Sequence, residues 1–115
     1  MRVKYFFLAA MSFCSVTLFA QTKTDTVKVW GVCDECKGKI EKAAKQGGAA
    51  GADWNMDNYM LVINYNADKT SALDIEKSIA AVGYDTQDVK ADDAVYKKLP
   101  ECCQYKRESN GTKQD

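Results

Sequence analysis

VWGVCDECKGKI, residues Val29–Ile40, is the stretch around which the rest of the chain is organised. An alternating apolar run ends at Gly31, two cysteines follow three positions apart, and a helical pattern begins at once. Cys33 and Cys36 therefore lie on one turn at the start of a predicted helix, where backbone N–H groups and the helix dipole favour thiolate over thiol. Such a pair can bind a soft metal ion, exchange with a disulfide, close into a structural disulfide or pack as inert thiols.

The composition limits the chemistry that the protein can perform. The chain has 115 residues, which is enough for one small domain, with 16 basic and 16 acidic residues. A formal net charge of zero and the lack of a long basic run argue against a nucleic-acid partner. The sequence has no histidine, so the commonest general base and the commonest nitrogen ligand for zinc or copper are both missing. A metal site must therefore use sulfur, carboxylate or backbone oxygen.

Residues 1–20 have the features of a secretory signal peptide. Arg2 and Lys4 give a positive start, Tyr5–Phe19 carries no charge, and a polar segment follows Ala20. The apolar run is short for a membrane-spanning helix. We predict cleavage after Ala20, and hence an exported protein, periplasmic or extracellular, with no membrane association once the signal is removed.

Six further elements are predicted from hydrophobic periodicity. Strands show alternation and helices show apolar residues three and four apart. We expect strands at Thr24–Trp30, Ala49–Met56, Tyr59–Tyr65 and Tyr84–Val89, and helices at Cys36–Gly47 and Ala72–Val82. In the second strand the alternation places Ala50, Ala52, Trp54 and Met56 on one face. The order predicts an α+β ferredoxin-like βαββαβ sandwich, in which two helices cover one face of a four-stranded antiparallel sheet.

A C-terminal extension follows this unit. Residues 24–90 form the predicted domain and residues 91–115 the extension. Within the extension, Asp92–Leu99 is expected to make about two helical turns, the pair Cys102–Cys103 follows, and Gln104–Asp115 is a polar tail.

The chain resembles heavy-metal-associated domains, the small βαββαβ modules of soft-metal chaperones and metal-exporting ATPases. The motif Gly31-x-Cys33-x-x-Cys36 at the first strand–helix junction carries the resemblance, together with the element order and AVGYD at Ala81–Asp85. The tail Tyr96–Tyr105, which contains LPECCQY, resembles that of exported members. The resemblance implies metal binding, and as partner a metal-transport protein or another metal donor or acceptor.

Cys33 and Cys36 are the predicted metal ligands. Two thiolates without histidine suit a soft ion. Cu(I) is favoured because two sulfurs satisfy it, and Zn(II), Cd(II) or Hg(II) are alternatives with added ligands. Zn(II) prefers four ligands, to which Asp34 or Glu35 could contribute a carboxylate oxygen.

Cys102 and Cys103 are candidate additional ligands. Adjacent cysteines rarely form a disulfide with each other, because the ring is strained. The last predicted strand ends about 20 Å from the cysteine loop, a distance that the extension can span. The pair could join the metal site, form disulfides with the first pair, or remain separate.

Tyr84 and Asp34 are expected beside the two cysteine ligands. Tyr84 occupies the position before the last strand where an aromatic residue approaches the metal loop in the resembled family. It could shield the loop from water, or serve packing alone.

Two functions remain open from the sequence. The leading hypothesis is a non-enzymatic protein that captures or transfers a soft metal ion. The alternative is a thiol–disulfide redox protein or a disulfide-stapled interaction module. Thioredoxin-like enzymes need a proline facing the CxxC, and the only proline is Pro100 in the extension.

Overall fold

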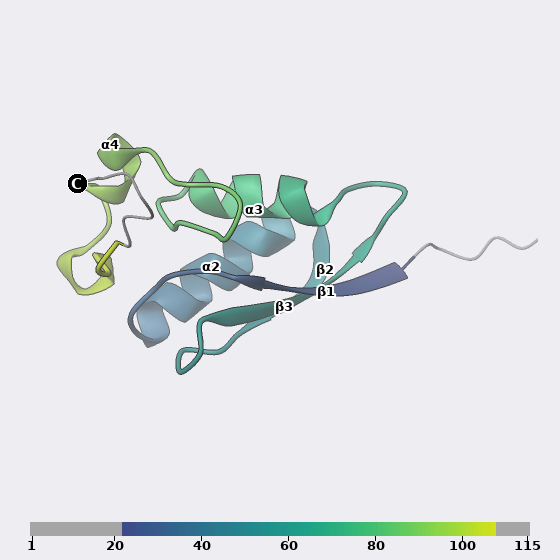
Figure 1. Cartoon of the computed structure of the whole chain (residues 1–115), viewed down its shortest axis with the longest axis horizontal. Coiled ribbons are helices and arrows are strands. Elements are labelled where there is room, and N and C mark those ends of the chain that lie inside the picture. The colour runs from purple at the N-terminus through teal and green to yellow at the C-terminus, as the bar shows by residue number, and fades with distance from the viewer. Residues whose placement is uncertain (1–21, 108–115) are drawn as a thin grey trace, which may run out of the picture.

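The computed structural model describes residues 22–107, which form one sheet, two long helices and a short helical tail. The elements are β1 (Thr22–Lys28), α2 (Asp34–Gln46), β2 (Ala49–Trp54), β3 (Met60–Asn66), α3 (Ala72–Ala80), α4 (Asp93–Tyr96) and the 3-10 helix η1 (Glu101–Cys103). The strand order is β1-β3-β2, and both pairs are antiparallel. Helices α2 and α3 pack together on one face of the sheet (Figure 1). This is the predicted ferredoxin-like α+β fold.

The core lies between that face and the two helices. Val27, Leu61, Ile63 and Tyr65 alternate along β1 and β3 and are all buried, as the period of two predicts. From the helices, Ile40, Ile75 and Ile79 are completely buried. The apolar stripe of each helix thus covers the apolar face of the sheet.

The predicted inward face of β2 is wrong at both ends. A bulge between Ala49 and Gly51 shifts the register against β3, so Ala49 is buried and Ala50 is exposed. The strand ends at Trp54, and Met56 in the following turn is 38% exposed. One inserted residue exchanges the two faces of a strand, which an alternation count does not detect.

The fourth predicted strand, Tyr84–Val89, is reduced to a single bridge between Val29 and Thr86. The chain turns back at once, because the Thr86 N–H donates to the Val89 carbonyl at 2.7 Å. The Thr86 hydroxyl donates to the Glu76 carboxylate of α3, also at 2.7 Å, and Glu76 is 1% exposed. A buried carboxylate needs such donors, and a turn supplies them where a continuous strand would not.

The extension returns to the end of the sheet where β1 leads into α2. In Figure 1, η1 lies close to that loop, and α4 lies beyond the end of α3. The predicted two turns of helix are shortened to α4, Asp93–Tyr96. Within residues 22–107, no helix has the length and apolar character needed to cross a membrane. The predicted signal peptide and the last part of the polar tail fall outside the described residues.

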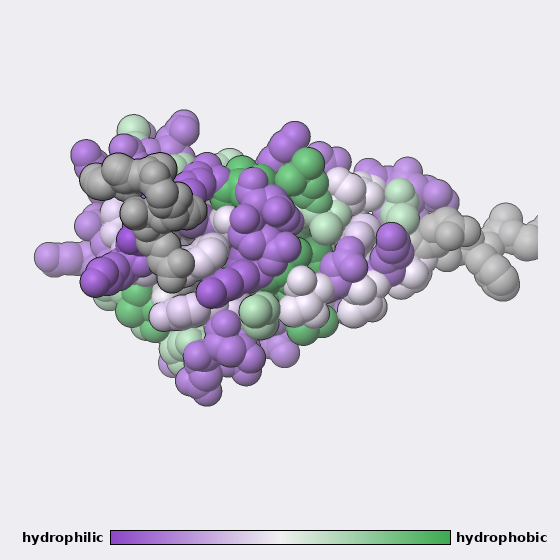
Figure 2. All heavy atoms as spheres, in the orientation of Figure 1, coloured by the Kyte–Doolittle hydropathy of each residue, from purple (hydrophilic) through white to green (hydrophobic). Residues whose placement is uncertain are grey.

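The face of the molecule drawn in Figure 2 is mainly hydrophilic. Figure 2 shows small hydrophobic patches among hydrophilic residues on this face, most of them near the middle of the molecule. Among the described residues, the large apolar side chains that remain exposed are spread over loops, strands and helices: Val32, Met56, Val62, Leu73 and Val82.

Candidate metal centre

Cys33 and Cys36 lie at the start of α2. Cys33 is the residue before the first helical position, in an extended conformation, and its carbonyl accepts from the Lys37 N–H at 3.1 Å. Cys36 lies on the inner side of the first turn and is completely buried. The two sulfur atoms are 3.7 Å apart. The two sulfur atoms therefore face the same small region, which Cys33 borders on the solvent side and Cys36 on the core side.

Cys103 brings a third sulfur to the same point. The Sγ atoms of Cys33, Cys36 and Cys103 all lie within 4.8 Å of one another, and Cys103 is completely buried. The four cysteines of residues 22–107 are free thiols. We call Cys33, Cys36 and Cys103 the inner cluster. The sequence left open whether the tail reaches the loop, and in the structure it does so through Cys103.

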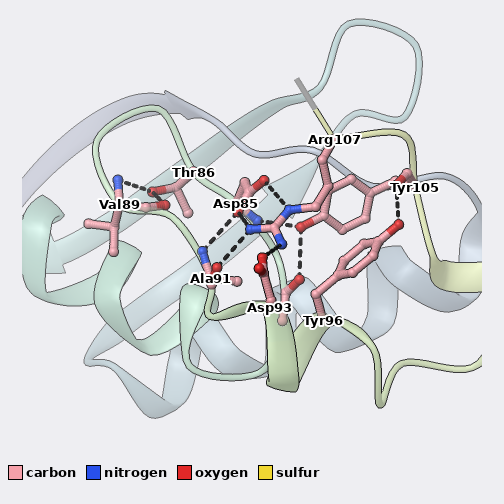
Figure 3. Close-up of polar contacts among 9 residues, drawn as sticks. Asp85, Thr86, Val89, Ala91, Asp93, Tyr96, Tyr105 and Arg107 are labelled. Atoms are coloured by element: carbon pink, nitrogen blue, oxygen red, sulfur yellow. Dashed lines mark hydrogen bonds and ion pairs between the residues drawn. The ribbon is translucent and has the colours of Figure 1, made fainter. Parts of the chain in front are cut away.

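An ion pair fastens the tail behind Cys103. Arg107 donates to both carboxylate oxygens of Asp85, at 3.0 Å from Nε and 2.7 Å from Nη2 (Figure 3). The same guanidinium donates to Asp93 and to the Ala91 carbonyl, each at 2.7 Å. The Asp85 side chain is only 3% exposed. A planar guanidinium suits this bidentate contact, and its partner Asp85 raises the pKa of Arg107 further above its usual range.

Tyr105 adds a second fastening. Its hydroxyl donates to the Gly83 carbonyl and accepts from the Asp85 N–H, both at 2.8 Å. Its ring stacks on Tyr84 with centroids 5.8 Å apart and meets Tyr96 edge-on at 5.0 Å. The aromatic rings and the ion pair together hold the segment that carries Cys103 against the cysteine loop.

The three thiols of the inner cluster differ in their ionisation. The pKa of Cys33 is lowered, mainly because the Cys36 backbone N–H faces its sulfur, although partial burial opposes the effect. Burial, followed by the neighbouring Cys103 thiol, raises the pKa of Cys36 to about 11. Burial also raises the pKa of Cys103. The cluster thus combines one thiol with a lowered pKa and two whose pKa values are raised.

Cys102 and Glu35 lie outside the inner cluster. Both are exposed, and the Cys102 thiol donates to Glu35 Oε1 at 3.3 Å. The Glu35 carboxylate therefore raises the pKa of Cys102. The Cys102 carbonyl lies 3.6 Å from the sulfur of Cys33, which holds this part of the tail against the loop.

Tyr84 and Asp34, predicted beside the ligands, have different surroundings. Tyr84 is completely buried, and its hydroxyl has no hydrogen-bond partner within residues 22–107. Burial raises its pKa, and the nearby thiols of Cys103 and Cys36 raise it further. Asp34 is exposed in the first turn of α2, and its carboxylate is not among the converging ligand atoms of the inner cluster.

Sequence reasoning missed the residues that fasten the tail. The sequence singles out Asp85 and Tyr105 only within stretches that resemble the family, and it predicts that Tyr105 and Arg107 belong to a polar tail. That expectation is wrong up to Arg107, since Tyr105 is 3% exposed. The available signal was an aromatic residue and an arginine two positions apart, within an otherwise polar segment.

The order in which the thiols react is a direct test of this arrangement. We expect iodoacetamide at neutral pH to modify Cys33 first, because it is partly exposed and its pKa is lowered. Cys102 should follow, and Cys36 and Cys103 should react only on unfolding. Mass spectrometry of timed samples measures the order. Early modification of Cys103 would contradict the buried position of its thiol.

Solved structures of known proteins share the fold described above. No family model matches the sequence, and neither does any curated protein. Among solved structures, a CopZ metallochaperone is 27% identical with a TM-score of 0.53, covering 56% of this chain and 98% of its own. Oxidized MerP from Ralstonia metallidurans CH34 is 28% identical with a TM-score of 0.54, covering 57% of this chain and 94% of its own. The fold is thus like that of heavy-metal-associated domains.

Proposed function

We propose that this protein is a non-enzymatic carrier of a soft metal ion, which it binds through the thiolates of Cys33, Cys36 and Cys103. One observation carries the proposal: three sulfur atoms from two distant parts of the chain lie within 4.8 Å of one another. Two of them are buried, and the chain has no histidine. Likeness to a metallochaperone supports the same function.

The donor set favours Cu(I). Thiolates select soft ions, and Cu(I) is satisfied by two or three sulfurs. Hg(II) and Cd(II) also bind such sites. Zn(II) prefers four ligands, so it would need a further donor beyond the inner cluster.

Transfer would proceed by ligand exchange at Cys33. It is the cluster thiol nearest solvent, and its pKa is lowered. A thiol of the acceptor protein would bind the ion while Cys33 is released, with Cys36 and Cys103 still attached. The partner is a metal-transport protein or another metal donor or acceptor.

The proposed site of action is outside the cytoplasm. The proposal rests on the signal-peptide features of residues 1–20. In an oxidising compartment free thiols are vulnerable, and a bound ion, with burial of two of the three sulfurs, would protect them.

Metal titration of the purified, reduced protein under anaerobic conditions tests the function. We expect one tightly bound Cu(I) per chain, which Zn(II) displaces only weakly, and loss of this tight binding in the double variant Cys33→Ser with Cys36→Ser. Cys102→Ser is the matched control, because its thiol is exposed and outside the cluster. The proposal is overturned if reduced protein binds no soft ion, or if the double variant binds as well as the wild type.

A thiol–disulfide redox protein is the second candidate. The 3.7 Å separation of the Cys33 and Cys36 sulfurs, one accessible and one buried, favours it. A redox titration and an insulin-reduction assay separate the candidates. A carrier does not catalyse insulin reduction, whereas a redox enzyme loses that activity in Cys33→Ser.

A further inference from the structure

A second group of ligand atoms adjoins the inner cluster. Glu35, Cys102 and Cys103 offer a carboxylate oxygen and two sulfurs, all within 4.8 Å of one another. We call Glu35, Cys102 and Cys103 the outer cluster. The two clusters share Cys103, which is completely buried, whereas the other two members of the outer cluster are exposed.

The local fold explains the shared sulfur. Cys102 and Cys103 are the last two residues of η1 and differ in burial, the first exposed and the second buried. Glu35 belongs to the first turn of α2, between the two cysteines of the CxxC motif. It accepts from the Cys102 thiol at 3.3 Å, so two ligand atoms of the outer cluster are already at a separation that one ion can bridge.

We propose that the outer cluster is a loading site, which takes up a soft metal ion at Cys102, Cys103 and Glu35 and delivers it to the inner cluster around the shared Cys103 sulfur. The inference deepens the proposed function and rests on it. The incoming substrate is a thiophilic ion carried by thiols, either of a small molecule or of a partner protein.

Each step of the transfer exchanges one ligand for another, with no change of oxidation state. Cys102 gives up its proton, forms a metal–sulfur bond and displaces one donor thiolate, which leaves as the thiol with that proton. Cys103 replaces a second donor thiolate in the same way. The Glu35 carboxylate adds a third bond to the ion without any proton change. Cys33 and Cys36 then form metal–sulfur bonds as the bonds to Cys102 and Glu35 break, and Cys103 stays bound throughout. Of the two protons that Cys33 and Cys36 give up, one goes to Cys102, which is released as a thiol, and the other goes to solvent.

The donor atoms set the direction of transfer. The outer cluster offers two sulfurs and a hard oxygen at the surface, and the inner cluster offers three sulfurs, two of them buried. A soft ion prefers the all-sulfur set. The exposed cluster is therefore more accessible, and the buried one binds more tightly.

Cd(II) tests the outer cluster by itself, because this ion accepts both sulfur and oxygen and its thiolate complexes absorb in the ultraviolet. In the double variant Cys33→Ser with Cys36→Ser, we expect one weakly bound Cd(II), lost when Cys102→Ser is added. Glu35→Gln should weaken that binding by about tenfold, and the neighbouring exposed Asp34→Asn should leave it unchanged. Absence of Cd(II) binding in the double variant overturns the proposal, as does equal loss with Asp34→Asn.

Loading kinetics test delivery in the chain with its inner cluster intact. Cd(II) bound to a small dithiol is mixed with each protein in a stopped-flow instrument, and the thiolate absorbance is followed. We expect Cys102→Ser to load about tenfold more slowly and to reach the wild-type stoichiometry and final spectrum. An unchanged rate overturns the loading role while leaving the inner cluster as a carrier. If the wild type binds no Cd(II), Cu(I) or Hg(II), the proposed function itself has failed.

Discussion

Replacing Arg107 with alanine is expected to lower the free energy of unfolding by about 3 kcal/mol, because it leaves the buried Asp85 carboxylate without its charged partner. The Asp85 side chain is 3% exposed and that of Arg107 is 22% exposed, so water compensates little. Asp85 retains only the donation from the Ala91 N–H, at 2.8 Å, among its described side-chain contacts. The loss should also release the tail and make the Cys103 thiol reactive.

Chemical denaturation and thiol labelling measure these two effects. Asp93→Asn is the matched control, since Asp93 binds the same guanidinium but its side chain is 83% exposed. We expect that control to change stability by less than about 0.5 kcal/mol. If Arg107→Ala unfolds at the same denaturant concentration as the wild type and keeps Cys103 unreactive, the ion pair does not hold the tail.

Two substitutions of Tyr84 should distinguish its contribution to core packing from its contribution to metal binding. Tyr84→Ala removes a completely buried ring that stacks on Tyr105, and it should cost about 4 kcal/mol. Tyr84→Phe keeps the ring and removes a hydroxyl that has no hydrogen-bond partner within the described residues. The phenylalanine variant should therefore be about as stable as the wild type without metal.

With a soft ion bound, the two proteins should differ. Thiolate sulfurs of Cys36 and Cys103 accept a hydrogen bond more readily than thiols do, and the Tyr84 hydroxyl is near enough for both to affect its pKa. We expect Tyr84→Phe to lower Cu(I) affinity by about tenfold, measured by competition with a chromophoric Cu(I) chelator. Equal affinity of the phenylalanine variant and the wild type would assign Tyr84 to packing alone.

The sequence predicted the fold through periodicity, and failed where a single side chain changed the backbone path. Val27 lies between the polar residues Thr26 and Lys28 and faces the core as expected. The last predicted strand does not form, because Thr86 turns to donate a hydrogen bond to Glu76. The sequence does not indicate that this glutamate, on an amphipathic helix, is buried. The bulge after Ala49 was missed for a similar reason. It shifts the register of β2 against β3, and a count of alternating residues does not detect that shift.

The candidate site was predictable to the extent that it is local. Cys33 and Cys36 are close in sequence, so their convergence follows from helix geometry. Cys103 comes from a segment about seventy residues later, and its position depends on contacts among Asp85, Tyr105 and Arg107. None of these three residues lies in a sequence pattern that predicts its contacts, which form only when the chain folds.

The Asp85–Arg107 pair also sets the order in which the site can be assembled during synthesis. The sheet and both long helices precede Asp85, so they can fold while the tail is still being made. Arg107 follows all three cysteines of the inner cluster, and the tail cannot be locked until that residue has emerged. Docking of the tail requires the folded unit that carries Asp85, so it is expected to be the last step of folding. Until then Cys33 and Cys36 form an open two-thiol site, and the finished chain converts it into a three-thiol one.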